Sequence, residues 1–180
     1  MEEPIAHTRE ELLARNGSFV ETFAAGDLPI RPRLRQLILS CVDARVDPAY
    51  FLGLELGEAL VIRTLGGRVT DNVERDIAVL AKLMGVGGSD GHRFDVLIIH
   101  HTDCGLERLA DQDQRTQISQ ASGIDEGVLE ALAIHNHDVA LGTDVRRLRN
   151  SKLVSESVDV SGYLYDHTSG TLTEVDVPEL

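Results

Sequence analysis

Two cysteines and a pair of histidines, each next to an apolar run, are the residues of this sequence best suited to chemistry. Cys41 stands in the segment SCVDARVDP, and His100 and His101 precede Cys104 in the segment HHTDCGLE. Thiolate sulfur together with imidazole nitrogen suits zinc. Three such ligands leave the fourth zinc position open, as in catalytic rather than structural sites. Zinc in that state lowers the pKa of a bound water to about 7, which makes a hydroxide nucleophile available.

An acidic and a basic residue follow the first cysteine at positions that share one face. If the chain stays extended after the strand, alternate residues point to the same side. Cys41, Asp43 and Arg45 are then expected on one face. Asp43 could then accept a hydrogen bond from zinc-bound hydroxide, and Arg45 would keep that carboxylate ionised and oriented. The alternative is a structural ion pair without a catalytic role.

The segments around these residues predict an α/β fold. Three apolar runs have the length and composition of buried strands: 34–40, 58–64 and 93–100. Helical periodicity and capping signals are found in four segments: 9–25, 71–84, 125–141 and 143–150. An alternating C-terminal segment, about 157–176, predicts a hairpin. This order predicts a central, mostly parallel β-sheet of about four strands plus an antiparallel edge strand, flanked by helices.

The predicted sheet brings the two cysteines together although they lie far apart in the sequence. Cys41 and Cys104 each follow a predicted parallel strand. Residues just beyond the carboxyl ends of parallel strands converge on one crevice, where open α/β sheets build their sites. We therefore expect both sulfurs to reach the same metal ion.

The composition limits the class of protein and of partner. The 180 residues predict a single domain over 1–180, and the formal net charge of −13 argues against nucleic acid and against anionic membranes. The N-terminal segment has neither the basic nor the apolar stretch of a secretory signal, so a cytoplasmic location is expected. In that compartment two cysteines favour metal binding or catalysis over a disulfide.

Taken together, the CVDAR and HTDC motifs resemble the paired signature of the β-class carbonic anhydrases. The intervening VIRTLGG resembles that family's Ile-Arg-Asn-Ala-Gly-Gly segment, with Thr64 and Leu65 in place of Asn and Ala. The closing GYLYDHTSGTL resembles the family's last strand pair. The resemblance is clearest between Leu37 and Gly105, and it implies a β-carbonic anhydrase-like fold for the whole chain.

The resemblance also implies an activity and a set of site residues. It places zinc on Cys41, His101 and Cys104, with Asp43 and Arg45 as the adjoining catalytic dyad. The implied enzyme is a carbonate dehydratase, a zinc lyase that interconverts carbon dioxide and bicarbonate. The implied assembly is a homodimer or a dimer of dimers, with no nucleic-acid or membrane partner.

The other histidines are expected to have supporting roles. Strand alternation agrees with His101 as the ligand, because two adjacent strand residues cannot easily face the same metal. His100 is then expected to be packed in the core or to support the ligands without binding the metal. His135 and His137 are expected on a polar helical face, and a proton relay is the alternative.

Three other functions stay open at this level. Some proteins that resemble the family hydrolyse carbonyl sulfide or carbon disulfide with the same ligands, so the access channel would set the substrate. A non-catalytic zinc protein would keep Asp43 as a fourth ligand, although such a closed site has no need of Arg45. A thiol redox pair is disfavoured because neither cysteine lies in a Cys-x-x-Cys motif.

Overall fold

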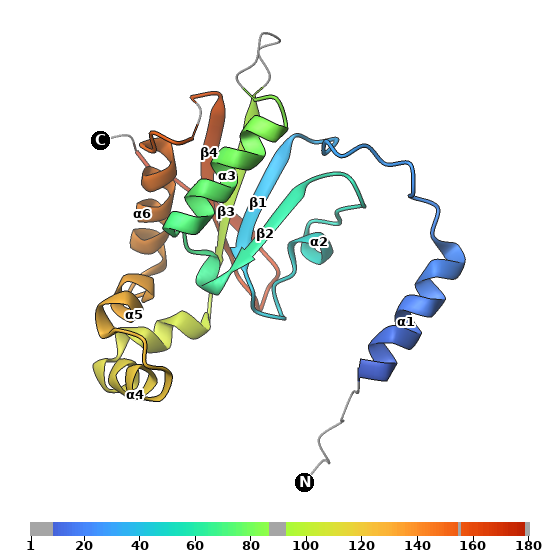
Figure 1. The fold of residues 1–180 in the computed structure, drawn as a ribbon. Helices are drawn as coiled ribbons and strands as arrows, with labels where there is room; N and C mark the ends of the chain where they lie inside the picture. The colour runs from blue at the N-terminus through green and yellow to red at the C-terminus, as the bar shows by residue number, and fades with distance from the viewer. Residues whose placement is uncertain (1–8, 87–92, 155, 179–180) are drawn as a thin grey trace. The chain divides into compact units, whose positions relative to one another are not determined.

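The computed structural model describes residues 9–86, 93–154 and 156–178 (Figure 1). The chain divides into two compact units, 1–30 and 31–180. The first unit holds helix α1 (Arg9–Thr22), which buries none of its side chains. This helix occupies the start of the segment expected to be helical and ends at Thr22. The organisation of 1–180 as a single domain stays a prediction.

One five-stranded sheet forms the centre of the second unit (Figure 1). The strands are β1 (Gln36–Cys41), β2 (Leu60–Thr64), β3 (Phe94–His101), β4 (Val158–Tyr165) and β5 (Leu172–Val175). Their order is β2-β1-β3-β4-β5, and all neighbours pair in parallel except β4 with β5. The predicted mostly parallel sheet with an antiparallel edge strand is therefore confirmed.

Helices and short 3-10 turns connect the strands. They are α2 (Pro48–Phe51), η1 (Leu65–Gly67), α3 (Asp71–Leu83), η2 (Gly105–Ala110), α4 (Gln112–Ser122), α5 (Glu126–Leu132) and α6 (His137–Arg149). The prediction of one helix over 125–141 was wrong, because α6 starts anew where the Asn136 side chain accepts the N–H of Val139 at 3.0 Å. Helix α6 then continues through Gly142 to Arg149, so the helix expected at 143–150 is its second half.

The two faces of the sheet bury different groups. One face packs Leu37, Leu39, Val96 and Ile98 against α3 and α6. The other face carries a cluster that includes Ile38, Ile99, Tyr165 and both cysteines. Successive strand residues point to opposite faces. His100 therefore lies on the α6 side and His101 on the side of the cysteines.

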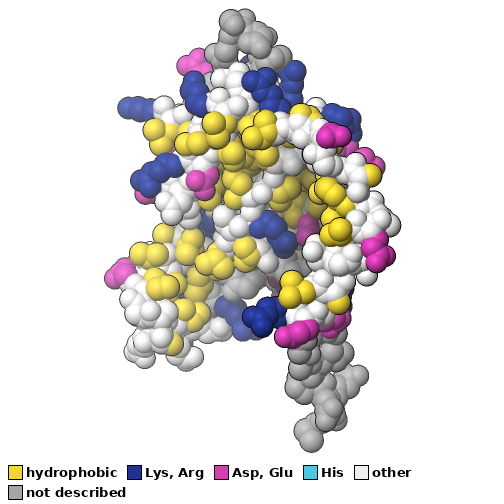
Figure 2. Space-filling model, turned by 45° about the vertical axis from the view of Figure 1, so that its right-hand side comes forward, with side chains coloured by type: hydrophobic (Ala, Val, Ile, Leu, Met, Phe, Trp, Pro, Cys, Tyr) yellow, Lys and Arg dark blue, Asp and Glu magenta, His cyan; other side chains and the backbone are white. Residues whose placement is uncertain are grey.

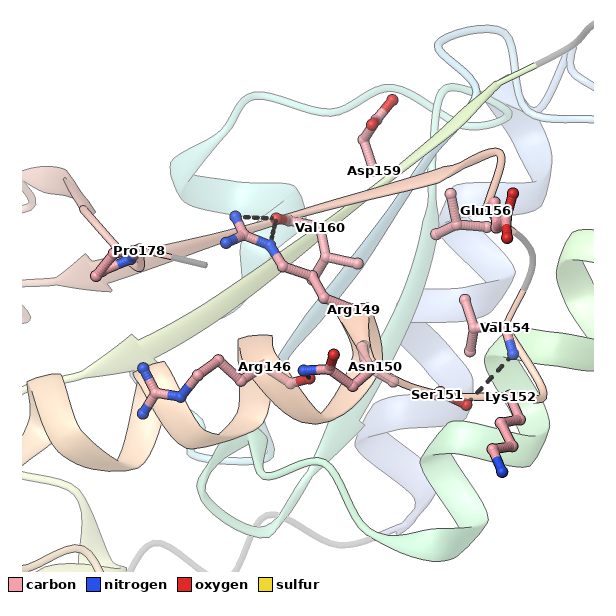
Figure 3. A pocket seen from close by; sticks show the side chains of 12 residues that line it. Arg146, Arg149, Asn150, Ser151, Lys152, Val154, Glu156, Asp159, Val160 and Pro178 are labelled. Atoms are coloured by element: carbon pink, nitrogen blue, oxygen red, sulfur yellow. Dashed lines mark hydrogen bonds between the residues drawn. The ribbon is translucent and has the colours of Figure 1, made fainter. Parts of the chain in front are cut away.

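A cavity of about 940 Å³ opens between the end of α6 and the start of β4 (Figure 3). It lies at the end of the sheet away from the cysteines, because β4 begins opposite the start of β3. Arg149 donates to the carbonyls of Val160 and Val177 there, and Asp159 pairs with Arg93. These polar groups hold chain segments together, so this cavity is not the candidate site. No helix in the described part of the chain is long and apolar enough to cross a membrane.

Candidate metal centre

Cys41, His101 and Cys104 meet at the C-terminal ends of β1 and β3. One sulfur or ring nitrogen from each residue lies within 4.8 Å of the other two. All three side chains are buried, and none is more than 4% exposed. The structure thus brings together the three residues that the motifs singled out, and it leaves His100 on the opposite face.

The ring of His101 presents one free nitrogen to this cluster. Its Nδ1 lies 2.9 Å from the carbonyl oxygen of Thr102, which assigns the ring N–H to Nδ1. Its Nε2 is buried without a hydrogen-bond partner among the described residues. A buried ring nitrogen without a partner, next to two thiols, fits a metal ligand whose other nitrogen is held by a carbonyl.

The two thiols are prepared for the same role. The pKa of Cys41 is lowered to about 4, most of all by its hydrogen bond with the Cys104 thiol and against the effect of burial. His101 and the backbone N–H of Asp43, 3.4 Å from the sulfur, contribute to the same lowering. The same hydrogen bond and burial raise the pKa of Cys104. One thiolate is therefore present near neutral pH, and two thiolates with one imidazole are a donor set that fits zinc.

Asp43 and Arg45 form a close pair beside the cluster. Arg45 Nη2 donates to Asp43 Oδ2 at 2.7 Å, and Arg45 Nε donates to Asp43 Oδ1 at 3.0 Å. The backbone N–H of Arg45 also donates to Oδ1 at 2.9 Å, which closes a tight turn. These bonds hold the pKa of Asp43 well below its usual range and raise that of Arg45. Asp43 is therefore an ionised carboxylate in a fixed orientation.

Three further residues, which the motifs did not single out, hold the loops that follow β1 and β3 in place. Arg63 in β2 donates to the carbonyls of Cys41 and Asp43 at 2.9 and 2.6 Å. Asp103 accepts from Arg45 Nη1 at 2.7 Å. Glu107 accepts the N–H of Cys104 at 2.7 Å. The position of Glu107, three residues after Cys104, is a helix-capping spacing and was the available signal.

The glycine pair after β2 allows close approach to the strands that carry the ligands. Gly66 and Gly67 both have φ of +67°. A Cβ on Gly67 would lie 3.0 Å from the carbonyl oxygen of Ile99, next to the end of β3. Leu65, which replaces the family's Ala, is 57% exposed. The departure at this position therefore points away from the metal cluster.

His135 and His137 each lie beside a glutamate carboxylate. His135 Nε2 lies 2.8 Å from Glu130 in an exposed position. His137 Nε2 lies 3.0 Å from the Glu107 carboxylate that binds the Cys104 N–H.

A cavity of about 710 Å³ opens beside the cluster, and its lining includes Asp43, Arg45, Asp103, Cys104 and Glu107. Of the three cluster residues, Cys104 lines this cavity.

Comparison with known proteins agrees with this arrangement. Residues 36–161 match the family model described as carbonic anhydrase. β-Carbonic anhydrase 1 of Mycobacterium tuberculosis is 32% identical over 171 residues, which cover 92% of this chain and 96% of that protein. The chain belongs to the β-carbonic anhydrase family. Zinc is the metal of this family, and the Cys-His-Cys cluster is suited to hold it.

Two further relatives place the chain within and beside the β-carbonic anhydrases. The crystal structure of a carbonic anhydrase from Streptococcus mutans is 30% identical, with a TM-score of 0.79 and coverage of 93% of this chain and 96% of that one. A carbon disulfide hydrolase of Saccharolobus solfataricus is 26% identical over 160 residues, which cover 75% of this chain and 74% of that protein. The relatives of this chain therefore include proteins named for two different substrates.

Proposed function

We propose that this protein is a zinc-dependent carbonic anhydrase that catalyses the reversible hydration of carbon dioxide to bicarbonate. We further propose that Cys41, His101 and Cys104 are the zinc ligands and that Asp43 and Arg45 are the catalytic dyad. The observation that carries the proposal is the buried Cys-His-Cys cluster with an ionised carboxylate beside it, open to a cavity of about 710 Å³. Zinc, when bound, supplies the Lewis acidity that makes hydroxide available at neutral pH.

The chain's own residues then orient the reaction. The Asp43 carboxylate can only accept hydrogen bonds, so it holds the nucleophilic oxygen with its lone pair directed at carbon dioxide. Arg45 binds both oxygens of Asp43 and keeps that carboxylate from turning. Phe51 and Leu106 belong to the apolar cluster around the thiols and limit access of bulk water. The proton released in each cycle passes to buffer or to a shuttle group.

Stopped-flow hydration of carbon dioxide by the zinc-loaded protein at about pH 8.5 tests the proposal, because that pH lies above the pKa of about 7 typical of water on zinc. We expect turnover in the parent protein and none after Cys104→Ser. The control is the zinc content of both proteins, since the variant should lose metal together with activity. No turnover from a parent protein that holds one zinc per chain would refute the assignment.

The replacement Arg45→Ala separates the enzyme from a non-catalytic zinc protein. A permanently closed site with Asp43 on the metal needs no arginine, so its properties would not change. In the enzyme, the loss of an orienting partner outside the metal ligands lowers activity by about 10–100-fold. The same stopped-flow assay measures this loss, and an unchanged rate would argue against the dyad.

Hydrolysis of carbon disulfide or carbonyl sulfide is a second candidate function. It is favoured by the 26% identity to the Saccharolobus solfataricus hydrolase over three quarters of the chain. Both reactions need the same ligands, so the two activities are compared by turnover of each gas under the same conditions. We expect carbon dioxide to be the better substrate, and faster turnover of either sulfur compound would reverse the assignment.

We also propose that the protein forms a homodimer or a dimer of dimers in the cytoplasm. Strand β2 is an edge strand without a second neighbour among the described residues, and its Val61 is 41% exposed. Helix α1 exposes its apolar side chains: Leu12, Leu13, Phe19 and Val20. Hydrophobic side chains also occupy much of the face drawn in Figure 2.

Two free cysteines support a reducing compartment. Analytical ultracentrifugation measures the assembly, and cell fractionation measures the location.

A further inference from the structure

His167 lies in the turn between β4 and β5, but the turn does not need its imidazole. Asp166 Oδ1 accepts the backbone N–H of Thr168 at 2.8 Å and the hydroxyl of Thr168 at 2.6 Å. The N–H of Gly170 donates to the Asp166 carbonyl at 2.8 Å. The His167 side chain is directed elsewhere, and it is only 21% exposed. Its partners are the two residues between His101 and Cys104.

Two hydrogen bonds join His167 to Thr102. Thr102 Oγ1 accepts the backbone N–H of His167 at 3.2 Å and lies 2.9 Å from His167 Nδ1. A hydroxyl has one hydrogen and two lone pairs, so Thr102 Oγ1 can pair with Nδ1 in either tautomer of the ring. The other ring nitrogen, Nε2, lies 3.6 Å from Asp103 Oδ2.

Both partners of His167 act on the candidate site. The Thr102 carbonyl accepts from Nδ1 of His101 and so sets the orientation of that ring. Asp103 binds the Arg45 guanidinium through its carboxylate at 2.7 Å and through its carbonyl at 2.9 Å. Asp103 makes these contacts with φ of +56°, a conformation that non-glycine residues hold only when their surroundings impose it.

We propose that His167 is a positioning residue of the metal centre. Through Thr102 it holds the His101 ring toward the metal, and through Asp103 it holds Arg45 against Asp43. The proposal rests on the proposed function, since it assigns the two routes to zinc binding and to catalysis respectively. His167 itself touches neither the three ligands nor Asp43 in any contact that the structure describes.

Three variants separate the two routes. His167→Ala removes both side-chain contacts and keeps only the backbone N–H bond to Thr102, whereas the amide of His167→Asn can still hydrogen-bond to the Thr102 hydroxyl near the position of Nδ1 but cannot reach Asp103. Thr168→Ala is the matched control, because it removes a hydrogen bond of the same turn without touching Thr102 or Asp103. For each protein we would measure zinc affinity by competition with a chromogenic chelator, kcat and KM for carbon dioxide hydration, and the melting temperature without zinc.

We expect His167→Ala to lose about 10-fold or more in zinc affinity and in kcat, which is the usual size for a partner outside the metal ligands. Its KM and its zinc-free melting temperature should stay close to those of the parent protein. His167→Asn should regain zinc affinity but not kcat, and Thr168→Ala should match the parent.

Three results would overturn the proposal: unchanged zinc affinity and kcat in His167→Ala, equal losses in Thr168→Ala, or an Asn variant that binds zinc as weakly as the Ala variant. The zinc-affinity measurement needs no catalysis. If the parent protein does not hydrate carbon dioxide, the proposed function fails while the order of zinc affinities still tests the positioning role.

Discussion

The buried ion pair between Arg68 and Asp144 should be a main determinant of stability. The Arg68 side chain is 10% exposed and that of Asp144 is 2% exposed, and Arg68 Nε donates to Asp144 Oδ2 at 2.6 Å. Arg68 Nη1 also donates to the carbonyls of Leu132 and Ala133, so the guanidinium links the segment between η1 and α3 to α5 and α6. His100 Nε2 lies 3.2 Å from the same carboxylate oxygen.

The replacement Asp144→Ala leaves the Arg68 charge buried without a counter-charge. Breaking a buried pair in this way costs about 3–5 kcal/mol of unfolding free energy. At about 2–4 °C per kcal/mol for a chain of this size, the melting temperature should fall by about 6–20 °C. Urea and thermal unfolding followed by circular dichroism, with and without zinc, measure both quantities.

The chain offers a matched control on its surface. Asp159 pairs with Arg93, and both side chains are more than half exposed. Asp159→Ala should therefore cost no more than about 1 kcal/mol. The double replacement Arg68→Met with Asp144→Leu should recover much of the loss, since it removes both charges at once. The reasoning would be refuted if Asp144→Ala destabilised the protein no more than Asp159→Ala does.

Three further outcomes are expected. Burial lowers the pKa of His100 below its ordinary value of 6.5, so below that pH the unfolded chain binds a proton that the folded chain does not. The free energy of unfolding should therefore fall as the pH drops below 6.5. His100→Asn should flatten this slope in urea unfolding between pH 7.5 and 5.5. Gly67→Ala and Gly123→Ala both place a side chain at positive φ, which costs about 1–2 kcal/mol of stability. Only the new side chain at Gly67 meets a backbone oxygen, so Gly67→Ala should be the more destabilising change. Equal losses of stability in thermal unfolding would contradict this. Arg63→Met removes two donors to the carbonyls of Cys41 and Asp43. It should lower kcat about 10-fold with little change in melting temperature. An unchanged kcat in the stopped-flow assay would show that these donors do not matter.

The sequence predicts those parts of the fold that depend on burial. The strands β1 and β3 are covered on both faces, so they form continuous apolar runs that are easy to recognise. Helix α4 escaped prediction because it buries no side chain and has no apolar periodicity. The break between α5 and α6 depends on the Asn136 cap, which an otherwise periodic segment conceals.

In the candidate site, too, one part could be predicted from the sequence and another could not. The ends of the parallel strands predict that Cys41 and Cys104 meet, and the resemblance to the β-carbonic anhydrases implies His101 as their companion. The structure brings the three residues together. The contacts of Asp103 and His167 could not be foreseen in the same way. They depend on one residue at positive φ and on a turn more than sixty positions away, and neither leaves a local pattern in the sequence.

The order of strands in the sheet has a consequence for folding kinetics. The candidate ligands lie at the ends of β1 and β3 or just beyond them, and these strands are neighbours in space although β2 and α3 separate them along the chain. The three donors therefore come together only after this non-local pairing has formed, and such pairing is the slow part of folding in parallel sheets. Zinc would enter a site that is already built, so it should slow unfolding and leave the rate of refolding unchanged.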